Sequence, residues 1–146
     1  MTVAPSISDF FLASAELGNV EYMKTILHSH SHELNKDVLD ESLRYATENH
    51  SLAAVKLLVK SGARESYSNA PGASASYSCF AQAICQGDLD VAKYMAKKFD
   101  LRHLTCGKIR WAAGEAEEKG HDEALEFLIS LPDVSRHLVK WRPCQK

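Results

Sequence analysis

Three histidines alternate with serines in the segment His28-Ser29-His30-Ser31-His32, and imidazole nitrogens are among the ligands that zinc prefers. A structural zinc site needs four ligands, and no cysteine lies within several residues of this cluster. A His/Ser composition is also ordinary for a solvated loop that follows a helix. We therefore predict no metal site and no cofactor, and we keep a small metal-binding helical protein that uses His28, His30 and His32 as an alternative.

The cysteines Cys79, Cys85, Cys106 and Cys144 contain no C-x-x-C pair, which favours reduced thiols. Cys79 and Cys85 lie on one predicted helix, where their spacing puts them on different faces, and we interpret both as small buried residues. A cysteine nucleophile needs a histidine base and a third orienting group, and Cys106 with His103 is an unspecific combination.

The glycines Gly114 and Gly120 do not make a phosphate-binding loop, because the Gly-Lys-Ser/Thr ending is missing. The carboxylates Glu115, Glu117 and Glu118 fit a solvated helix face. No motif supports catalysis, and we predict that the protein is not an enzyme.

The chain has 146 residues, 45% of them hydrophobic and 25% charged, as in ordinary globular proteins. This length predicts a single domain over residues 1–146. A net charge of -2 without a block of like charges argues against nucleic acid as a partner. The first twenty residues lack a basic n-region, and no apolar run approaches the roughly 18 residues of a membrane span. We expect a soluble, cytoplasmic protein, in a host cell if its source is a virus or an intracellular pathogen.

One pattern recurs four times along the chain, starting at Gly18, His50, Gly87 and Gly120. The spacing of 32, 37 and 33 residues is near the length of one helix-turn-helix unit. In each copy Gly or His ends one helix, a short polar residue caps the next, and apolar residues follow at helical spacing. The predicted caps are Asn19, Ser51, Asp88 and, in preference to the aligned His121, Asp122.

The apolar stripes of the first three copies have the spacing i, i+3, i+6, i+7, and they comprise Val20, Met23, Ile26, Leu27; Leu52, Val55, Leu58, Val59; and Leu89, Ala92, Met95, Ala96. Seven residues before each turn stand Phe11, Leu43, Phe80 and Ala113. Four residues before it stand the small residues Ser14, Ala46, Ala83 and Ala116, which let two helices approach closely. These patterns predict the first helix of each pair over residues 8–17, 38–48, 76–86 and 108–118.

Three segments carry a resemblance to a known family: Gly18-Asn19-Val20-Glu21, Gly87-Asp88-Leu89-Asp90, and Val55-Lys56-Leu57-Leu58 followed by Ser61-Gly62-Ala63. They resemble the ankyrin repeat family, which implies an all-α helical solenoid of about four helix-turn-helix repeats. The implied repeats span residues 6–32, 36–63, 74–100 and 106–131. Tetratricopeptide arrays have helix pairs of similar length, but their Trp-Leu-Gly-Tyr spacing is missing.

The long connection and the C-terminal tail each allow two interpretations. Residues 64–76 are polar and turn-rich, and they fit either an extended finger loop or a contact surface that uses Tyr67, Asn69 and Tyr77. At the other end, Pro132-Asp133 breaks the fourth pair and Ser135 starts an amphipathic stretch. We predict a capping helix over 134–142, and the alternative is a basic contact for an acidic partner or a membrane surface.

The ankyrin resemblance implies a protein–protein interaction module that binds a protein partner through its concave face and finger loops. The contact positions that it implies, together with Tyr67 of the long loop, are Asp37, Asp40, Glu48, Asn49, Tyr77, Gln86, Lys108, Arg110, Trp111 and Lys119. Trp111 fits either an aromatic anchor or a core residue. A self-associating structural or assembly protein is the alternative function, and a monomer or a weak homo-oligomer is expected.

Overall fold

The computed structural model describes residues 6–64, 66–68, 76–104 and 106–135. Within these ranges, the side chains of residues 66–68, 76, 77, 103, 106, 133 and 135 are not described. The chain divides into two compact units, Met1–Tyr67 and Ser68–Lys146. Each unit contains two of the predicted helix pairs.

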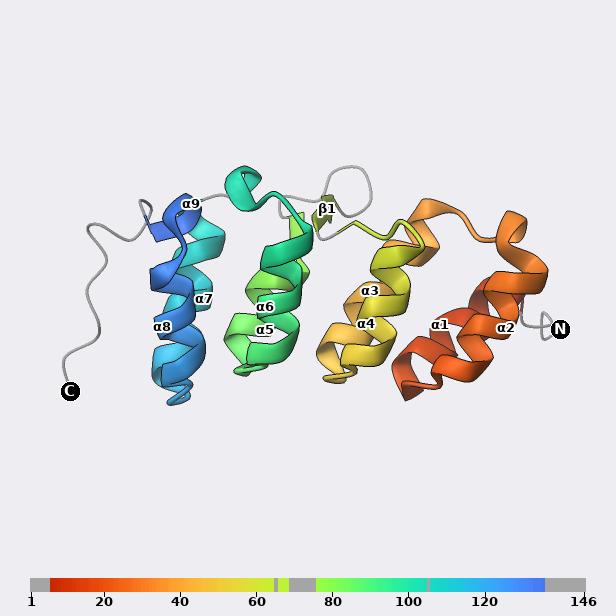
Figure 1. Ribbon diagram of the computed structural model, residues 1–146, viewed down its shortest axis with the longest axis horizontal. Helices are drawn as coiled ribbons and strands as arrows, with labels where there is room; N and C mark the ends of the chain where they lie inside the picture. Colours follow the sequence, from red (N-terminus) through yellow and green to blue (C-terminus); the bar gives the residue numbers. More distant parts are fainter. Residues whose placement is uncertain (1–5, 65, 69–75, 105, 136–146) are drawn as a thin grey trace, which may run out of the picture. The chain divides into compact units, whose positions relative to one another are not determined.

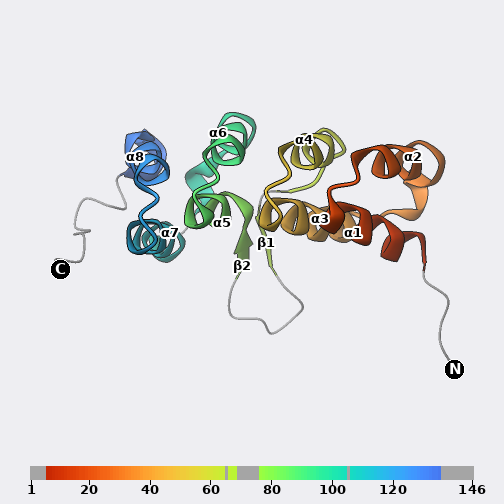
Figure 2. The ribbon, with the colours of Figure 1, turned by 90° about the horizontal axis from the view of Figure 1, so that it is seen from below.

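The first unit consists of two antiparallel helix pairs (Figure 1). Its elements are α1 (Ile7–Leu17), α2 (Val20–His30), the 3-10 helix η1 (Ser31–Glu33), α3 (Lys36–Glu48) and α4 (Leu52–Lys60). Helix α1 packs against α3 and α2 against α4, so that first helices form one layer and second helices the other (Figure 2).

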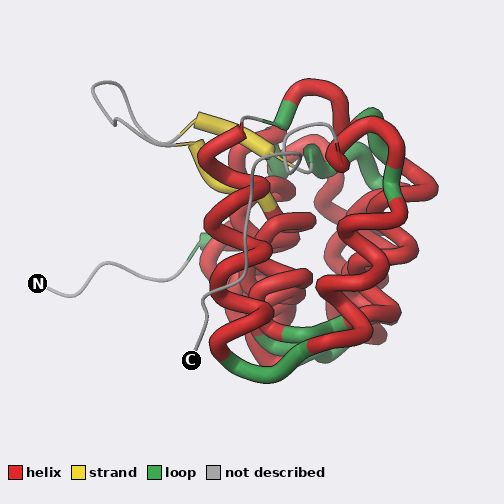
Figure 3. The backbone as a smooth tube through the Cα atoms, turned by 90° about the vertical axis from the view of Figure 1, so that its left-hand side faces the viewer, coloured by secondary structure: helices red, strands yellow, loops and turns green. Residues whose placement is uncertain are grey.

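The second unit repeats this arrangement with α5 and α7 in one layer and α6 and α8 in the other (Figure 2). Its helices are α5 (Cys79–Gln86), α6 (Leu89–Lys98), η2 (Leu101–His103), α7 (Cys106–Glu118), α8 (Asp122–Ser130) and α9 (Pro132–Ser135). The strands β1 (Ser66–Ser68) and β2 (Ser76–Ser78) pair as a two-stranded sheet (Figure 3).

The predicted first helices end where the structure ends them, at residues 17, 48, 86 and 118. The predicted start of the third one at residue 76 is wrong, because β2 occupies 76–78. The side chain of Ser78 then accepts a hydrogen bond from the backbone N–H of Ala81 at 3.1 Å, which caps α5.

Three of the four predicted caps are confirmed. Asn19, Ser51 and Asp88 precede α2, α4 and α6, and each side chain accepts a hydrogen bond from a backbone N–H of the first turn. The fourth prediction is wrong. His121 occupies the cap position without a side-chain bond, and Asp122 is already the first residue of α8.

The predicted core positions are buried in all four copies. The large set is Phe11, Leu43, Phe80 and Ala113, and the small set is Ser14, Ala46, Ala83 and Ala116, none of them more than 3% exposed. In the three apolar stripes the central residues are buried and the outer ones are half-buried. Cys79 and Cys85 are buried free thiols, as expected.

The C-terminal elements differ from the prediction. Helix α8 ends at Ser130, but Pro132 begins the short helix α9 instead of separating two elements, because proline is well tolerated at a first helical position. Val134 of α9 is fully buried. The remainder of the predicted capping helix, residues 136–142, lies outside the described residues.

The turn before α6 explains the unusual cap of α8. Gly87 has a left-handed φ of 74°, and a Cβ atom on it would lie 2.4 Å from Nδ1 of His121. The imidazole of His121 therefore packs against bare backbone at the neighbouring turn instead of capping its own helix. Gly120 has the same left-handed conformation, with φ of 75°, but a Cβ atom on it would meet nothing within 4 Å.

This pair of glycines gives a matched test of the contact. We expect Gly120→Ala to lower the free energy of unfolding by about 1–2 kcal/mol through the left-handed backbone alone. Gly87→Ala should lower it further, because the new methyl group also displaces the His121 ring. Urea unfolding followed by circular dichroism compares the two variants, and equal losses would show that the ring moves aside without cost.

Candidate functional site

Helix α7 carries a large aromatic side chain on its outer face. Ile109, Ala112 and Ala113 are buried on the inner side, whereas 43% of Trp111 is exposed. The structure therefore places Trp111 at the surface and not in the core. Arg110, beside it, is also exposed.

The surroundings of Trp111 leave its ring open to approach. Gly107 and Gly114 lie one turn before and one turn after it on the same side of the helix. A Cβ atom on either glycine would meet nothing within 4 Å. Nζ of Lys108 lies 6.0 Å from the centroid of the Trp111 ring, within reach of a cation–π interaction. The first half of α7 thus presents an aromatic ring with cationic groups beside it.

Lys119 directly follows α7 and forms polar contacts with side chains of two helices. Nζ of Lys119 lies 3.4 Å from Oε2 of Glu115 and 3.6 Å from Sγ of Cys85 on α5. Burial raises the pKa of the Cys85 thiol, and the charge of Lys119 offsets part of that rise. The pKa of Lys119 is raised, first by the charge of ionised Cys85 and also by Glu115. Because the thiol is neutral at pH 7, Glu115 balances the ammonium charge there.

The other predicted contact position of the second unit for which the structure shows a side chain is Gln86. It is half-buried at the end of α5, and its Oε1 accepts a hydrogen bond from Nε2 of Gln82 at 2.6 Å. Tyr67 and Tyr77 lie in β1 and β2, but their side chains are outside what the structure describes, and Asn69 lies outside the described residues altogether.

The first unit exposes Glu48 and Asn49 at the end of α3. Nδ2 of Asn49 donates to the backbone carbonyl of Tyr45 at 2.8 Å. Between these residues and the start of the helix, Arg44 forms an ion pair with Glu41 and lies 5.0 Å over the ring of Tyr45. The prediction omitted Glu41 and Tyr45, although Glu41 stands nine residues before the turn, as Trp111 does in the fourth copy.

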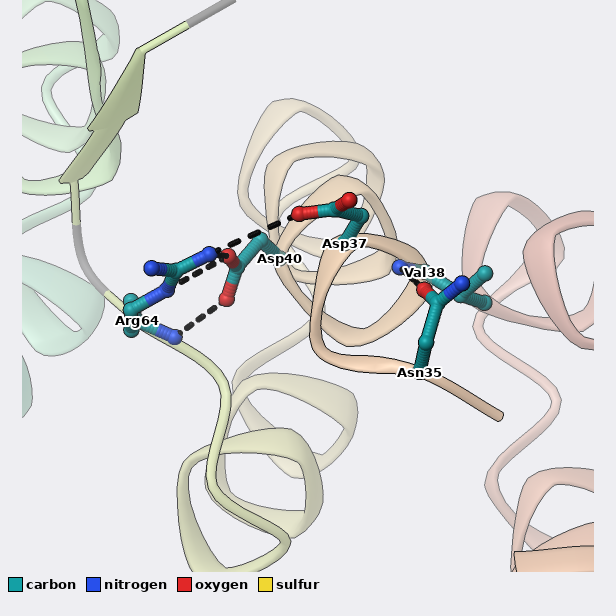
Figure 4. Close-up of polar contacts among 5 residues, drawn as sticks. All are labelled: Asn35, Asp37, Val38, Asp40 and Arg64. Carbon is teal, nitrogen blue, oxygen red and sulfur yellow. Dashed lines mark hydrogen bonds and ion pairs between the residues drawn. The ribbon is translucent and has the colours of Figure 1, made fainter. Parts of the chain in front are cut away.

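The prediction of Asp40 as a contact residue is wrong, because this carboxylate is fully buried. It accepts hydrogen bonds from the backbone N–H of Arg64 at 2.6 Å and from Nε of Arg64 at 2.8 Å (Figure 4). Its Oδ2 also lies 2.6 Å from Nη2 of the same side chain. Asp40 therefore anchors the segment after α4 to the second turn of α3.

Asp37 stands beside this anchor but plays a smaller part in it. Its side chain is 90% exposed, and its Oδ1 lies 3.6 Å from Nη2 of Arg64. The hydrogen bond and charge of Asp40, with a smaller contribution from Asp37, raise the pKa of Arg64, so the guanidinium stays charged. Asp37 remains accessible to a partner and Asp40 does not.

The histidine cluster does not converge on a common point. His28 and His32 are exposed, and Nδ1 of His30 lies 2.8 Å from Oε2 of Glu33. Among the described residues, no group of three or more His, Cys, Asp or Glu side chains is placed to hold a metal ion. The described helices also include none that is long and apolar enough to cross a membrane.

The two carboxylates around Arg64 allow a matched stability test. We expect Asp40→Asn to lower the free energy of unfolding by about 1–3 kcal/mol, because a buried charged acceptor of three donors is lost. Asp37→Asn should leave it unchanged within error, because its carboxylate is solvated and its ion pair is long. Urea denaturation measures both, and equal effects of the two variants would contradict the anchoring role of Asp40.

Comparisons with known proteins place the fold in a class. No family model matches the sequence, and no curated protein matches it. Among solved structures, the fold is similar to that of ankyrin repeat domains, which confirms the predicted helical-repeat solenoid class.

The crystal structure of the human ASB11 ankyrin repeat domain is one such structure, with a TM-score of 0.62 and 20% sequence identity. The match covers 82% of this chain and 52% of that one, so the chain spans about half the length of the solved domain.

Proposed function

We propose that the chain is a non-enzymatic protein–protein interaction module of the cytoplasm. It binds a protein partner through the exposed face of its first helices, which stacked helix pairs leave free of packing duty, and through the loops between pairs. The ankyrin-type fold supports this proposal, because such repeats offer a surface whose residues can vary without disturbing the core.

The observation that carries the proposal is the exposure of Trp111. Trp111 leaves 43% of its surface exposed, so a partner could bury the rest of its ring. Tryptophan and arginine are also the residue types most enriched among binding hot spots. Trp111 with Arg110 and Lys108 forms the centre of the proposed contact, and Lys119 lies at its edge.

The proposed contact set also includes residues on the first unit. Asp37, Glu48 and Asn49 are exposed on α3 and supply polar contacts, while Asp40 is excluded because its carboxylate is used by Arg64. Tyr67 and Tyr77 stay in the set as residues of the connection between α4 and α5. The acidic groups on α3 of the first unit fit a basic patch of a partner, and the cationic groups on α7 of the second unit fit an acidic patch.

The experiment is affinity capture by the purified protein from a lysate of its source organism or host, with identification by mass spectrometry. We expect Trp111→Ala to weaken binding of the captured partner by roughly 30-fold or more, as for a hot spot worth about 2 kcal/mol. Ile129→Ala is the matched control, because Ile129 is 46% exposed on α8, in the layer of second helices.

Both variants must give the circular dichroism spectrum and melting temperature of the wild type. A partner that binds wild type and Ile129→Ala but not Trp111→Ala supports the proposal. A partner that Trp111→Ala retains at full affinity contradicts the assignment of Trp111, and capture of no partner contradicts the proposed function.

A further inference from the structure

The first helix pair differs from the other copies at two aligned positions. The position eight residues before the turn holds Phe10 in the first pair. In the later pair of each unit it holds Ser42 and Ala112. Phe10 is 42% exposed, whereas Ser42 and Ala112 are at most 1% exposed. The same position is therefore buried in the later pair of each unit and open in α1.

The position four residues after the turn behaves in the same way. Tyr22 of α2 is 43% exposed, whereas the aligned Ala54 and Ala124 are at most 2% exposed. Within the two units α3 and α4 pack on α1 and α2, and α7 and α8 pack on α5 and α6. These two positions are thus the ones that a helix pair turns toward the pair before it.

A third residue extends this face. Leu17 lies seven residues after Phe10, on the same side of α1, and is 82% exposed. Its aligned residues in the other copies are the polar Asn49, Gln86 and Lys119. Three of the five large hydrophobic residues found exposed in the described chain, Phe10, Leu17 and Tyr22, therefore lie on one helix pair.

We propose that Phe10, Leu17 and Tyr22 form a self-association face on which a second copy of this chain docks with the same face across a two-fold axis. The face continues a contact that the protein already makes between its own helix pairs, so its geometry suits packing against helices. Two-fold pairing is also the commonest arrangement of soluble homo-oligomers.

The side chains favour a second copy over a further repeat of the same kind. In the later pair of each unit, Ser42 and Ala112 stand at the position of Phe10, and Ala54 and Ala124 stand at the position of Tyr22. Such small residues let neighbouring helices approach closely. Phe10 and Tyr22 would hold a further helix pair away from that distance. Across a two-fold axis each aromatic ring meets aromatic and aliphatic side chains of the other copy, where offset or edge-to-face packing adds to the burial of area.

The charge of the face also permits self-pairing. On α1 the exposed residues at the spacing of this face are Phe10, Ala13 and Leu17, and on α2 they are Tyr22, Thr25 and Ser29. All six are uncharged, so the face itself brings no like charges together when two copies pair. The proposal uses a different unit from the Trp111 surface and does not depend on it.

Sedimentation velocity of the full chain over a series of concentrations tests the proposal. We expect the mass of the wild type to rise from monomer to dimer. The double variant Phe10→Ser with Tyr22→Ala gives both positions the residues of the second copy, and it should raise the dissociation constant by at least about tenfold. Leu17→Asn, which copies Asn49, should weaken the dimer in the same direction without touching the core.

Ile129→Ala serves as the control, because it removes an exposed hydrophobic side chain from the other unit and should dimerise like the wild type. A wild type that stays monomeric at all concentrations overturns the proposal, as does a dimer that neither the double variant nor Leu17→Asn weakens. Species that grow beyond the dimer overturn the two-fold arrangement. The double variant should still capture the protein partner, so that a failure of self-association can be told apart from a failure of the proposed protein-binding function.

Discussion

The close approach of neighbouring first helices is the constraint on which both units depend. An isolated helix pair cannot bury its apolar face, so each pair must lie against another at short distance. Ser14 on α1 and Ala46 on α3 allow this in the first unit, and Ala83 on α5 and Ala116 on α7 allow it in the second. Once these small residues fix the inner side of each helix, the rotation of the helix decides which residues face water.

Much of this fold can be predicted from sequence because its determinants are local. The turn at Gly18, the cap at Asn19 and the apolar residues that follow lie within one short segment, and the segment recurs. The errors arise where a distant residue decides. Asp40 looks like an ordinary acidic residue near the start of a helix, and only its partner Arg64, 24 residues away, makes it a buried anchor. His121 makes no capping hydrogen bond, because its ring packs against Gly87 at the neighbouring turn.

The candidate site was partly accessible to the same reasoning. Periodicity alone left Trp111 between core and surface, but its aligned residues include Asp9 and Glu41, which are polar and indicate an outward position. By contrast, the repeat pattern places Phe11 at a core position seven residues before the turn, but it assigns no role to its neighbour Phe10. The role of Phe10 emerges only when the burial of Ser42 and Ala112 indicates which side of a first helix faces the preceding pair.

Both proposed surfaces consist of large apolar residues that their own unit leaves exposed. Those of the self-association face include Phe10 and Tyr22, whose positions are buried in the later pair of each unit. Complete burial of a fully exposed side chain of this kind gains about 1.5–3 kcal/mol, and Phe10, Tyr22 and Trp111, which are already more than half buried, would gain less. Leu17 and Trp111 occupy positions that are polar in other copies, and a contact outside the unit is the role that we propose for an apolar residue at both.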